Sequence, residues 1–148
     1  MRHLQAIADR VEIEALRSEA LDAIMMRDYD RFVSLFTPDG ALRIPVVNAE
    51  FVGREEIRAQ VERLHGTWEF FVQTTHPGPI QLDGDTASGR AYAAESGRFR
   101  DGSAHLNYAI YHDRYQRTPG GWKFTERLNE VRYVDTTPLA GSPPQAVA

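Results

Sequence analysis

The sequence contains no cysteine. This absence excludes disulfides, thiolate metal sites and cysteine nucleophiles, and it fits a reducing compartment such as the cytoplasm. Long apolar runs are also missing, because no stretch approaches the roughly 20 residues that a membrane span needs. The first residues, Met1 to Leu4, lead directly into a charged segment and not into a signal-peptide core. We therefore expect a cytoplasmic protein with no membrane partner.

Several catalytic signatures are absent as well. We find no glycine-rich phosphate loop after a strand, no serine nucleophile motif and no cluster with metal-ligand spacing. The net charge of −4 argues against a nucleic-acid partner, which selects a basic surface. We therefore expect no metal, and substrates that are neutral or weakly anionic remain open.

The composition of the 148-residue chain is that of an ordinary globular protein, with 42% hydrophobic and 26% charged residues. This length suits one domain with a sizeable core. The turn and apolar patterns end near residue 135, and prolines follow. We therefore predict a single domain over residues 1–135 and a C-terminal tail over residues 136–148.

The first third of the chain has helical periodicity. Ile13, Leu16, Ala20 and Ile24 recur at spacings of three and four, which predicts a helix with one apolar face. We read residues 5–36 as helical, with a second piece starting at residue 28. Residues 37–40 have turn chemistry. A short strand is predicted over residues 41–47, at a sheet edge because of its proline, and a third helix over residues 54–64.

The rest of the chain is typical of long strands. Residues 68–82, 86–98, 104–117 and 121–135 are rich in β-branched and aromatic side chains, and turn signals separate them. Helices followed by a meander indicate an α+β fold. We predict a cone-shaped α+β barrel, in which the N-terminal helices pack in a curved, mostly antiparallel sheet. An apolar pocket between the two is the natural site for a small molecule.

Several segments together resemble a known family. They are Arg27-Asp28-Tyr29-Asp30-Arg31-Phe32, residues 35–40, residues 51–57, residues 82–87, Tyr111-His112-Asp113-Arg114-Tyr115 and Gly120-Gly121-Trp122-Lys123-Phe124. The chain resembles the SnoaL-like branch of the nuclear transport factor 2 superfamily over about residues 5–135. That branch includes dehydratases, a dehydrochlorinase and polyketide cyclases. The resemblance implies a deep hydrophobic pocket and cofactor-free elimination or isomerisation.

The same resemblance suggests site residues. A pocket histidine removes a proton in these enzymes, commonly helped by an aspartate on the first helix. His76 lies in a matching Thr-x-His-x-Gly setting, and Arg127 ends a matching Trp-Lys-Phe-x-x-Arg pattern. The aspartate should fall at about residue 25, where the chain has Met25. Asp22 is the nearest carboxylate to that position.

Each catalytic candidate has a structural alternative. His76 follows an apolar patch, so its imidazole is either a general base in the pocket or a buried histidine bonded to backbone. Arg127 either stabilises developing negative charge or forms a salt bridge across the sheet. Asp22 lies off the apolar stripe of its helix, so it is exposed unless the helix bends. The group that orients His76 is unassigned, with Glu95 and Asp113 as further carboxylates on predicted strands.

The remaining candidates are predicted to bind substrate. Tyr92 and Tyr111 either donate to a substrate oxygen or belong to the aromatic core. Met25, Trp68 and Phe71 are pocket lining or core. Arg17 lies in the apolar stripe, either extending past the core edge or placing a cation at the pocket mouth.

The predicted function is that of a cofactor-independent lyase, a dehydratase or related eliminating enzyme, acting on a small hydrophobic ring compound with His76 as base. One alternative is an isomerase or polyketide cyclase that works through an enolate. Another is a ligand-binding or accessory domain without turnover. The broad outer face of such a sheet commonly pairs, so we expect a homodimer or homotrimer.

Overall fold

A computed structural model describes residues 2–144 of the chain. Three α-helices precede the long strands in the described residues, and a short 3-10 helix, η1 (Pro45–Val47), lies between two short strands. The α-helices are α1 (Arg2–Met25), α2 (Tyr29–Ser34) and α3 (Arg54–Gly66). The strands are β1 (Phe36–Ile44), β2 (Ala49–Val52), β3 (Trp68–Asp83), β4 (Thr86–Phe99), β5 (Ala104–Thr118) and β6 (Gly121–Asp135).

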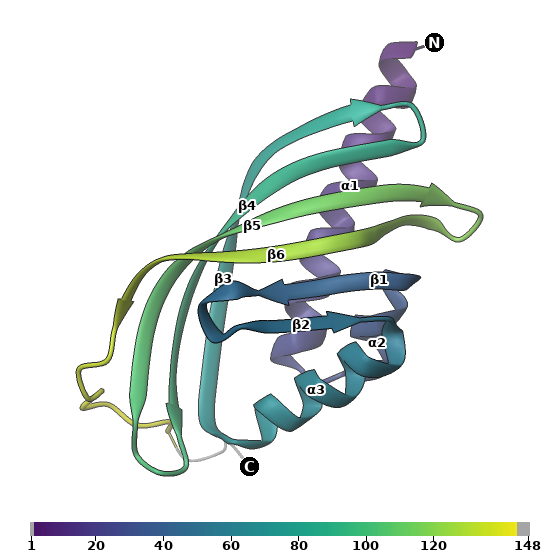
Figure 1. Cartoon of the computed structure of the whole chain (residues 1–148). Helices are drawn as coiled ribbons and strands as arrows, with labels where there is room; N and C mark the ends of the chain where they lie inside the picture. Colours follow the sequence, from purple (N-terminus) through teal and green to yellow (C-terminus); the bar gives the residue numbers. More distant parts are fainter. Residues whose placement is uncertain (1, 145–148) are drawn as a thin grey trace.

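The strands form one sheet in the order β2-β1-β6-β5-β4-β3. All neighbours are antiparallel except β1 and β6, which are parallel. The long strands curve strongly, and α1 runs along one face of the sheet (Figure 1). Helix α3 lies beside β1 and β2, near the C-terminal end of α1 (Figure 1). The fold is therefore the predicted α+β cone, but its sheet is curved and unclosed, with β2 and β3 at the edges.

The hydrophobic core lies between α1 and the concave face of the sheet. The apolar stripe of α1 is fully buried at Ile13 and Ala23 and nearly so at Ala20. Phe36 and Phe124 meet this helix from neighbouring strands, with their ring centroids 5.3 Å apart. The core confirms the periodicity read from the sequence, because side chains three and four residues apart share one face of a helix.

The predicted short strand was partly wrong. Strand β1 already begins at Phe36, so residues 37–40 lie in it and do not form a turn between elements. It pairs with β2 and β6, so it is not an edge strand. Pro45 is no obstacle because the strand ends at Ile44 and the proline opens η1, where its missing N–H costs no ladder hydrogen bond. Strand β2 was not predicted.

Two further features concern the ends of the domain. Residues 136–144 form neither helix nor strand, and Arg98 Nη1 donates to the carbonyl oxygens of Leu139 and Gly141. Residues 145–148 of the predicted tail lie outside the described residues. None of the helices within residues 2–144 combines the length and apolar composition of a membrane-spanning segment.

Candidate active site

A cavity of about 390 Å³ lies between the concave face of the sheet and the helices. One wall is apolar and comes mainly from α1, α3, β1, η1 and the ends of the long strands. Its side chains include Leu21, Ile24, Phe32, Leu42, Leu64, Trp68, Phe71, Phe99 and Val131. The opposite wall is polar and comes from β3 to β6. It consists of Gln73, Thr75, Glu95, His105, Asn107, Tyr111, Arg127 and Asn129.

The polar wall follows from the register of the sheet. Gln73, Glu95 and Asn107 lie directly opposite one another on β3, β4 and β5. Because side chains alternate along a strand, every second residue from these positions also faces the cavity. His105 and Tyr111 therefore share the inner face of β5 with Asn107. The wall has polar side chains from four strands within one pocket.

A histidine–carboxylate pair lies in this wall. His105 Nε2 lies 3.0 Å from Glu95 Oε1, and the two side chains are 15% and 16% exposed. Gln73 Nε2 donates to the other carboxylate oxygen of Glu95 at 3.1 Å. A carboxylate only accepts hydrogen bonds, so Nε2 carries a hydrogen, and in the neutral imidazole Nδ1 keeps the lone pair. Among the described residues Nδ1 has no hydrogen-bond partner, which leaves it available as a base.

Aromatic side chains hold the His105 ring. The rings of His105 and Trp68 meet edge to face, with centroids 4.8 Å apart, and Phe99 stacks on Trp68 and lies 6.1 Å from the His105 ring. Gly97 makes this possible, because a Cβ there would lie 2.6 Å from the Trp68 ring. The imidazole is thus fixed by Glu95 on one side and by packing on the other.

Tyr111 lies next to the pair, further along β5. Its hydroxyl accepts a hydrogen bond from Gln73 Nε2 at 3.1 Å, which leaves its own hydrogen free to donate. Burial raises the pKa of the Tyr111 phenol, so the group stays protonated near neutral pH. The guanidinium carbon of Arg127 lies 3.9 Å from the centre of the Tyr111 ring. Both residues therefore offer hydrogen-bond donors at this end of the cavity.

The positive charge of Arg127 is compensated by the carboxylate of Asp113. Its Nε and Nη2 donate to the two oxygens of Asp113 at 2.9 and 3.2 Å, and both residues are buried. Tyr115 also donates to Asp113, at 3.0 Å, and Arg17 Nε donates to the Tyr115 hydroxyl at 2.8 Å. The salt-bridge alternative for Arg127 is therefore present in the structure. Its Nη1 has no partner among the described residues, so one donor remains.

The prediction that His76 enters the pocket is wrong. His76 is exposed and lies on the outer face of the sheet, where it borders a shallow hollow with Tyr92, Tyr108, Ile110 and Arg132. Among the described residues no carboxylate is bonded to it. His76 therefore stays outside the cavity that contains His105.

A β-bulge explains the position of His76. Simple alternation would place His76 on the same face as Trp68, eight residues earlier, and Trp68 is buried inside. The pairing of β3 with β4 shifts between Trp68 and Phe70, which inserts one residue. Phe71, Gln73 and Thr75 consequently face the cavity, and His76 faces outward.

Two other predicted site residues also lie outside the cavity. Asp22 is 58% exposed and forms an ion pair with Arg31, as expected for a residue off the apolar stripe of its helix. Tyr92 is 43% exposed on the outer face, directly opposite His76 in the register of β3 and β4. The prediction that Tyr92 lines the pocket is wrong, because Tyr92 is one of the alternate residues of β4 whose side chains face outward.

Met25 and Arg17 are buried or half-buried but do not line the cavity. Met25 Sδ accepts the backbone N–H of Gln73 at 3.4 Å, so it stands between α1 and the edge strand β3. Arg17 is 5% exposed and bonds Tyr115 and the carbonyl oxygen of Gly78. The position of Arg17 inside the stripe is thus structural, and it places no cation at the pocket mouth.

Four predicted residues do line the cavity, namely Arg127, Tyr111, Trp68 and Phe71. The sequence prediction did not assign His105, Glu95, Gln73, Asn107 and Asn129 to this site. One signal was available: Glu95 and Asp113 stood out as carboxylates on predicted strands. His105 and His112 are seven residues apart on β5 and point to opposite faces, and the pairing of His105 with Glu95 depends on register across two strands.

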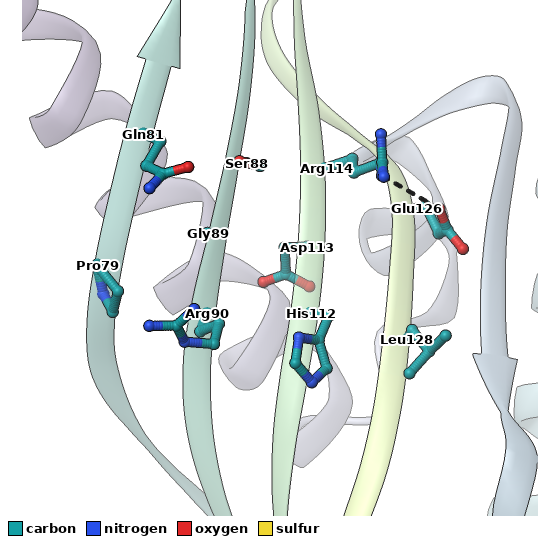
Figure 2. A pocket seen from close by; sticks show the side chains of 10 residues that line it. All are labelled: Pro79, Gln81, Ser88, Gly89, Arg90, His112, Asp113, Arg114, Glu126 and Leu128. Carbon is teal, nitrogen blue, oxygen red and sulfur yellow. Dashed lines mark ion pairs between the residues drawn. The ribbon is translucent and has the colours of Figure 1, made fainter.

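A second histidine–carboxylate pair lies on the outer face. His112 Nε2 is 2.8 Å from Glu130 Oε1, and both side chains are more than 40% exposed. His112 borders an open groove of about 310 Å³ that crosses β3 to β6, with α1 behind the sheet (Figure 2). The groove also contains the ion pair between Arg114 and Glu126 (Figure 2). Because this pair is open to solvent, it serves as a natural control for the buried one.

The fold and its cavity define a class, that of small α+β domains with an interior pocket. Residues 5–128 match the model of the SnoaL-like domain family, and the chain belongs to that family.

Named relatives share most of the chain. A gamma-hexachlorocyclohexane dehydrochlorinase of Sphingobium indicum is 28% identical over 146 residues, covering 95% of this chain and 90% of that protein. An uncharacterized protein of Mycobacterium tuberculosis is 25% identical over 130 residues, covering 86% and 88%. The crystal structure of LinA superposes with a TM-score of 0.86 at 26% identity, covering 97% of this chain and all of that one. A LinA-type3 hexachlorocyclohexane dehydrochlorinase of Novosphingobium barchaimii gives 0.84 at 25% identity, covering 96% and 99%.

Proposed function

We propose that this chain is a cofactor-independent lyase that removes a proton from a small, mostly apolar ring compound, with His105 as the general base. The contact between His105 Nε2 and Glu95 Oε1 in the cavity wall carries the proposal. A carboxylate that fixes the tautomer and orientation of an imidazole is a recurring arrangement for proton transfer. The similarity to a dehydrochlorinase supports an elimination.

The step needs few groups. Nδ1 of His105 takes a proton from a ring carbon, and the electron pair left behind forms a carbon–carbon double bond. A leaving group on the adjacent carbon departs with its bonding electrons. Tyr111 and the free Nη1 of Arg127, which line the same cavity, would stabilise that negative charge by hydrogen bonds. An isomerase or cyclase would use the same base but would keep the electron pair as an enolate.

The test is a turnover screen with ring alcohols, ketones, enones and halides. The wild-type protein is compared with His105→Gln, which keeps the volume and loses the base, and with Glu95→Gln. We expect His105→Gln to lower turnover by about 100-fold or more, and Glu95→Gln to lower it less. The matched controls are His112→Gln and Glu130→Gln, which break the exposed pair and should leave turnover unchanged.

The outcomes separate the candidate functions. Turnover that survives in His105→Gln would assign the base to another group. Wild-type protein that binds ring compounds but transforms none of them would favour the ligand-binding domain. Products that retain all substituents would favour the isomerase over the lyase.

A further inference from the structure

The open groove on the outer face of the sheet brings basic side chains together. Arg90 on β4 lies directly opposite His112 on β5, and Ser88 lies directly opposite Arg114. Residues two apart on a strand share one face of the sheet, so these four side chains are mutual neighbours. All four line the groove (Figure 2). We call Ser88, Arg90, His112 and Arg114 the outer quartet.

The glutamates nearest to the outer quartet lie on β6, along one side of it. Glu126 Oε2 is 3.7 Å from Arg114 Nε, and the other oxygen of Glu126 accepts Arg43 Nε at 2.8 Å. Glu130 accepts or donates to His112 Nε2 at 2.8 Å. Each glutamate is thus shared with a basic residue, and Arg114 has only a long contact with its partner.

Arg90 is the least compensated member. Within residues 2–144 its guanidinium forms no ion pair and no side-chain hydrogen bond, and it lies directly opposite a second basic side chain, His112. Asp113 also borders the groove, but both its oxygens are bonded to Arg127. Like charges directly opposite each other on neighbouring strands are destabilising when both are ionised. An anion placed over Arg90 and His112 would remove that repulsion.

The donors of the groove indicate the kind of anion. Guanidinium groups present forked N–H donors that match the oxygens of phosphate and carboxylate groups. The hydroxyl of Ser88 and the amide of Gln81, directly opposite it on β3, add neutral donors. Neither of these two side chains forms a hydrogen bond within residues 2–144. A phosphoryl group, with three terminal oxygens and up to two charges, uses more of these donors than a carboxylate does.

The groove is larger than a phosphoryl group needs. Its volume is about 310 Å³, which is in the range of sites for small organic molecules. Pro79 and Leu128 supply apolar surface at its two sides, on β3 and β6. The groove therefore has room for a small organic part next to the anionic group.

We infer that the outer quartet binds the phosphoryl group of a small phosphate monoester. The site lies on the face of the sheet opposite to the cavity, so the inference does not rest on the proposed elimination. Arg90 is the main contact, and its long exposed side chain can turn towards the ligand without moving the backbone. The site binds its ligand and makes or breaks no covalent bond.

The test is an NMR titration of ¹⁵N-labelled protein with phenyl phosphate at constant ionic strength. We expect the backbone amides of residues 88–90 and 112–114 to shift, with a Kd on the order of 1 mM. Arg90→Gln should weaken binding about tenfold, because it removes a charge-assisted contact. Arg114→Gln should weaken it less, since Glu126 already offsets part of that charge.

A matched control separates a site from general attraction. Arg63→Gln removes the same charge from an exposed position of α3 and should leave the Kd within about twofold of the wild-type value. Benzyl alcohol, which lacks the phosphoryl group, should not shift the amides of the outer quartet. Inorganic phosphate should shift them with weaker affinity, and equal affinity for phosphate and ester would assign the same site to free phosphate.

Three results would overturn the inference. They are an absence of shifts at residues 88–90 and 112–114, equal weakening by Arg90→Gln and Arg63→Gln, and unchanged binding in Arg90→Gln. Each variant changes an exposed side chain, so folding should be preserved. His105→Gln should bind phenyl phosphate like the wild type. Loss of turnover in that variant with intact phosphate binding keeps the two proposals independent.

Discussion

At the scale of single residues, the face on which a strand side chain lies decides which histidine can do chemistry. His76 and His105 both stand among apolar neighbours, but only His105 points into the cavity and meets a carboxylate. The aspartate that the family resemblance places near residue 25 is absent, and Met25 bonds the backbone of β3 there. The carboxylate that contacts a cavity histidine is instead Glu95, on β4 of the sheet.

This difference gives a direct prediction. We expect His76→Ala to leave the binding of ring compounds and any turnover within about twofold of the wild-type values, because an exposed side chain on the outer face does not contact the cavity. The measurement is the turnover screen, run in parallel with His105→Gln. A large loss in His76→Ala with intact folding would restore the histidine that the sequence first suggested.

At the scale of elements, the approach of Arg17 from α1 to the sheet depends on a glycine in β4. A Cβ at Gly89 would lie 2.4 Å from Arg17 Nη2 and 2.7 Å from the carbonyl oxygen of Pro79. Arg17 fills the space above Gly89 and bonds Tyr115, which in turn bonds Asp113 behind the cavity. The missing side chain in β4 is thus what allows a buried arginine of α1 to reach the sheet.

We therefore expect Gly89→Ala to lower the free energy of unfolding by about 1–3 kcal/mol, since the new methyl group displaces a buried guanidinium and meets rigid backbone. Urea denaturation measures the change. The matched control is Gly66→Ala at the end of α3, where nothing lies within 4 Å of the new Cβ. That substitution should be neutral or stabilise the protein by up to about 1 kcal/mol. Equal effects of the two substitutions would contradict this role for Gly89.

At the scale of the whole molecule, Asp9 fastens the first half of α1 to the β5–β6 hairpin. Its carboxylate accepts both terminal nitrogens of Arg117, at 2.8 and 2.9 Å, and the indole N–H of Trp122 at 3.2 Å. The hydrogen bonds from Arg117, joined by those of Gln5 and Trp122, lower the pKa of the Asp9 carboxyl to about 2. Residues more than 100 positions apart are held together at this point.

Asp9 should make stability depend on acid. A carboxyl whose pKa falls from 3.8 in the unfolded chain to about 2 in the folded protein stabilises the fold fully above pH 3.8, by about 2 kcal/mol. This contribution is lost as pH falls through about 2. We expect the stability difference between wild type and Asp9→Asn to be constant from pH 7 to 5 and to shrink between pH 4 and 2.

The control for this experiment is Asp85→Asn, which removes the exposed second partner of Arg117 and should change stability little at any pH. A difference in the free energy of unfolding between wild type and Asp9→Asn that stays constant down to pH 2 would rule out this contribution of the Asp9 carboxyl.

Assembly of the chain into a homodimer or homotrimer stays a prediction. The outer face that would form the contact exposes Tyr92, Tyr108 and Tyr133.

Periodicity and turn chemistry predicted the fold class and most of the helices and strands. Three- and four-residue spacing gave α1 and its buried stripe at Ile13, Leu16 and Ala20, and turn residues separated the four long strands within a residue or two of their ends. These signals are local, so they can be read along one segment of chain. Strand β2 and the central place of β1 were not found, because neighbour order in a sheet is not a local property.

The sequence by itself therefore determined the class of fold, the cavity between sheet and helices, and four residues that line it: Arg127, Tyr111, Trp68 and Phe71. Only the tertiary structure decided which histidine faces that cavity and which carboxylate meets it. The physical reason is that side chains alternate with a period of two, so the one-residue bulge between Trp68 and Phe70 turns His76 outward. Glu95 and His105 meet because β4 and β5 pair in one particular register.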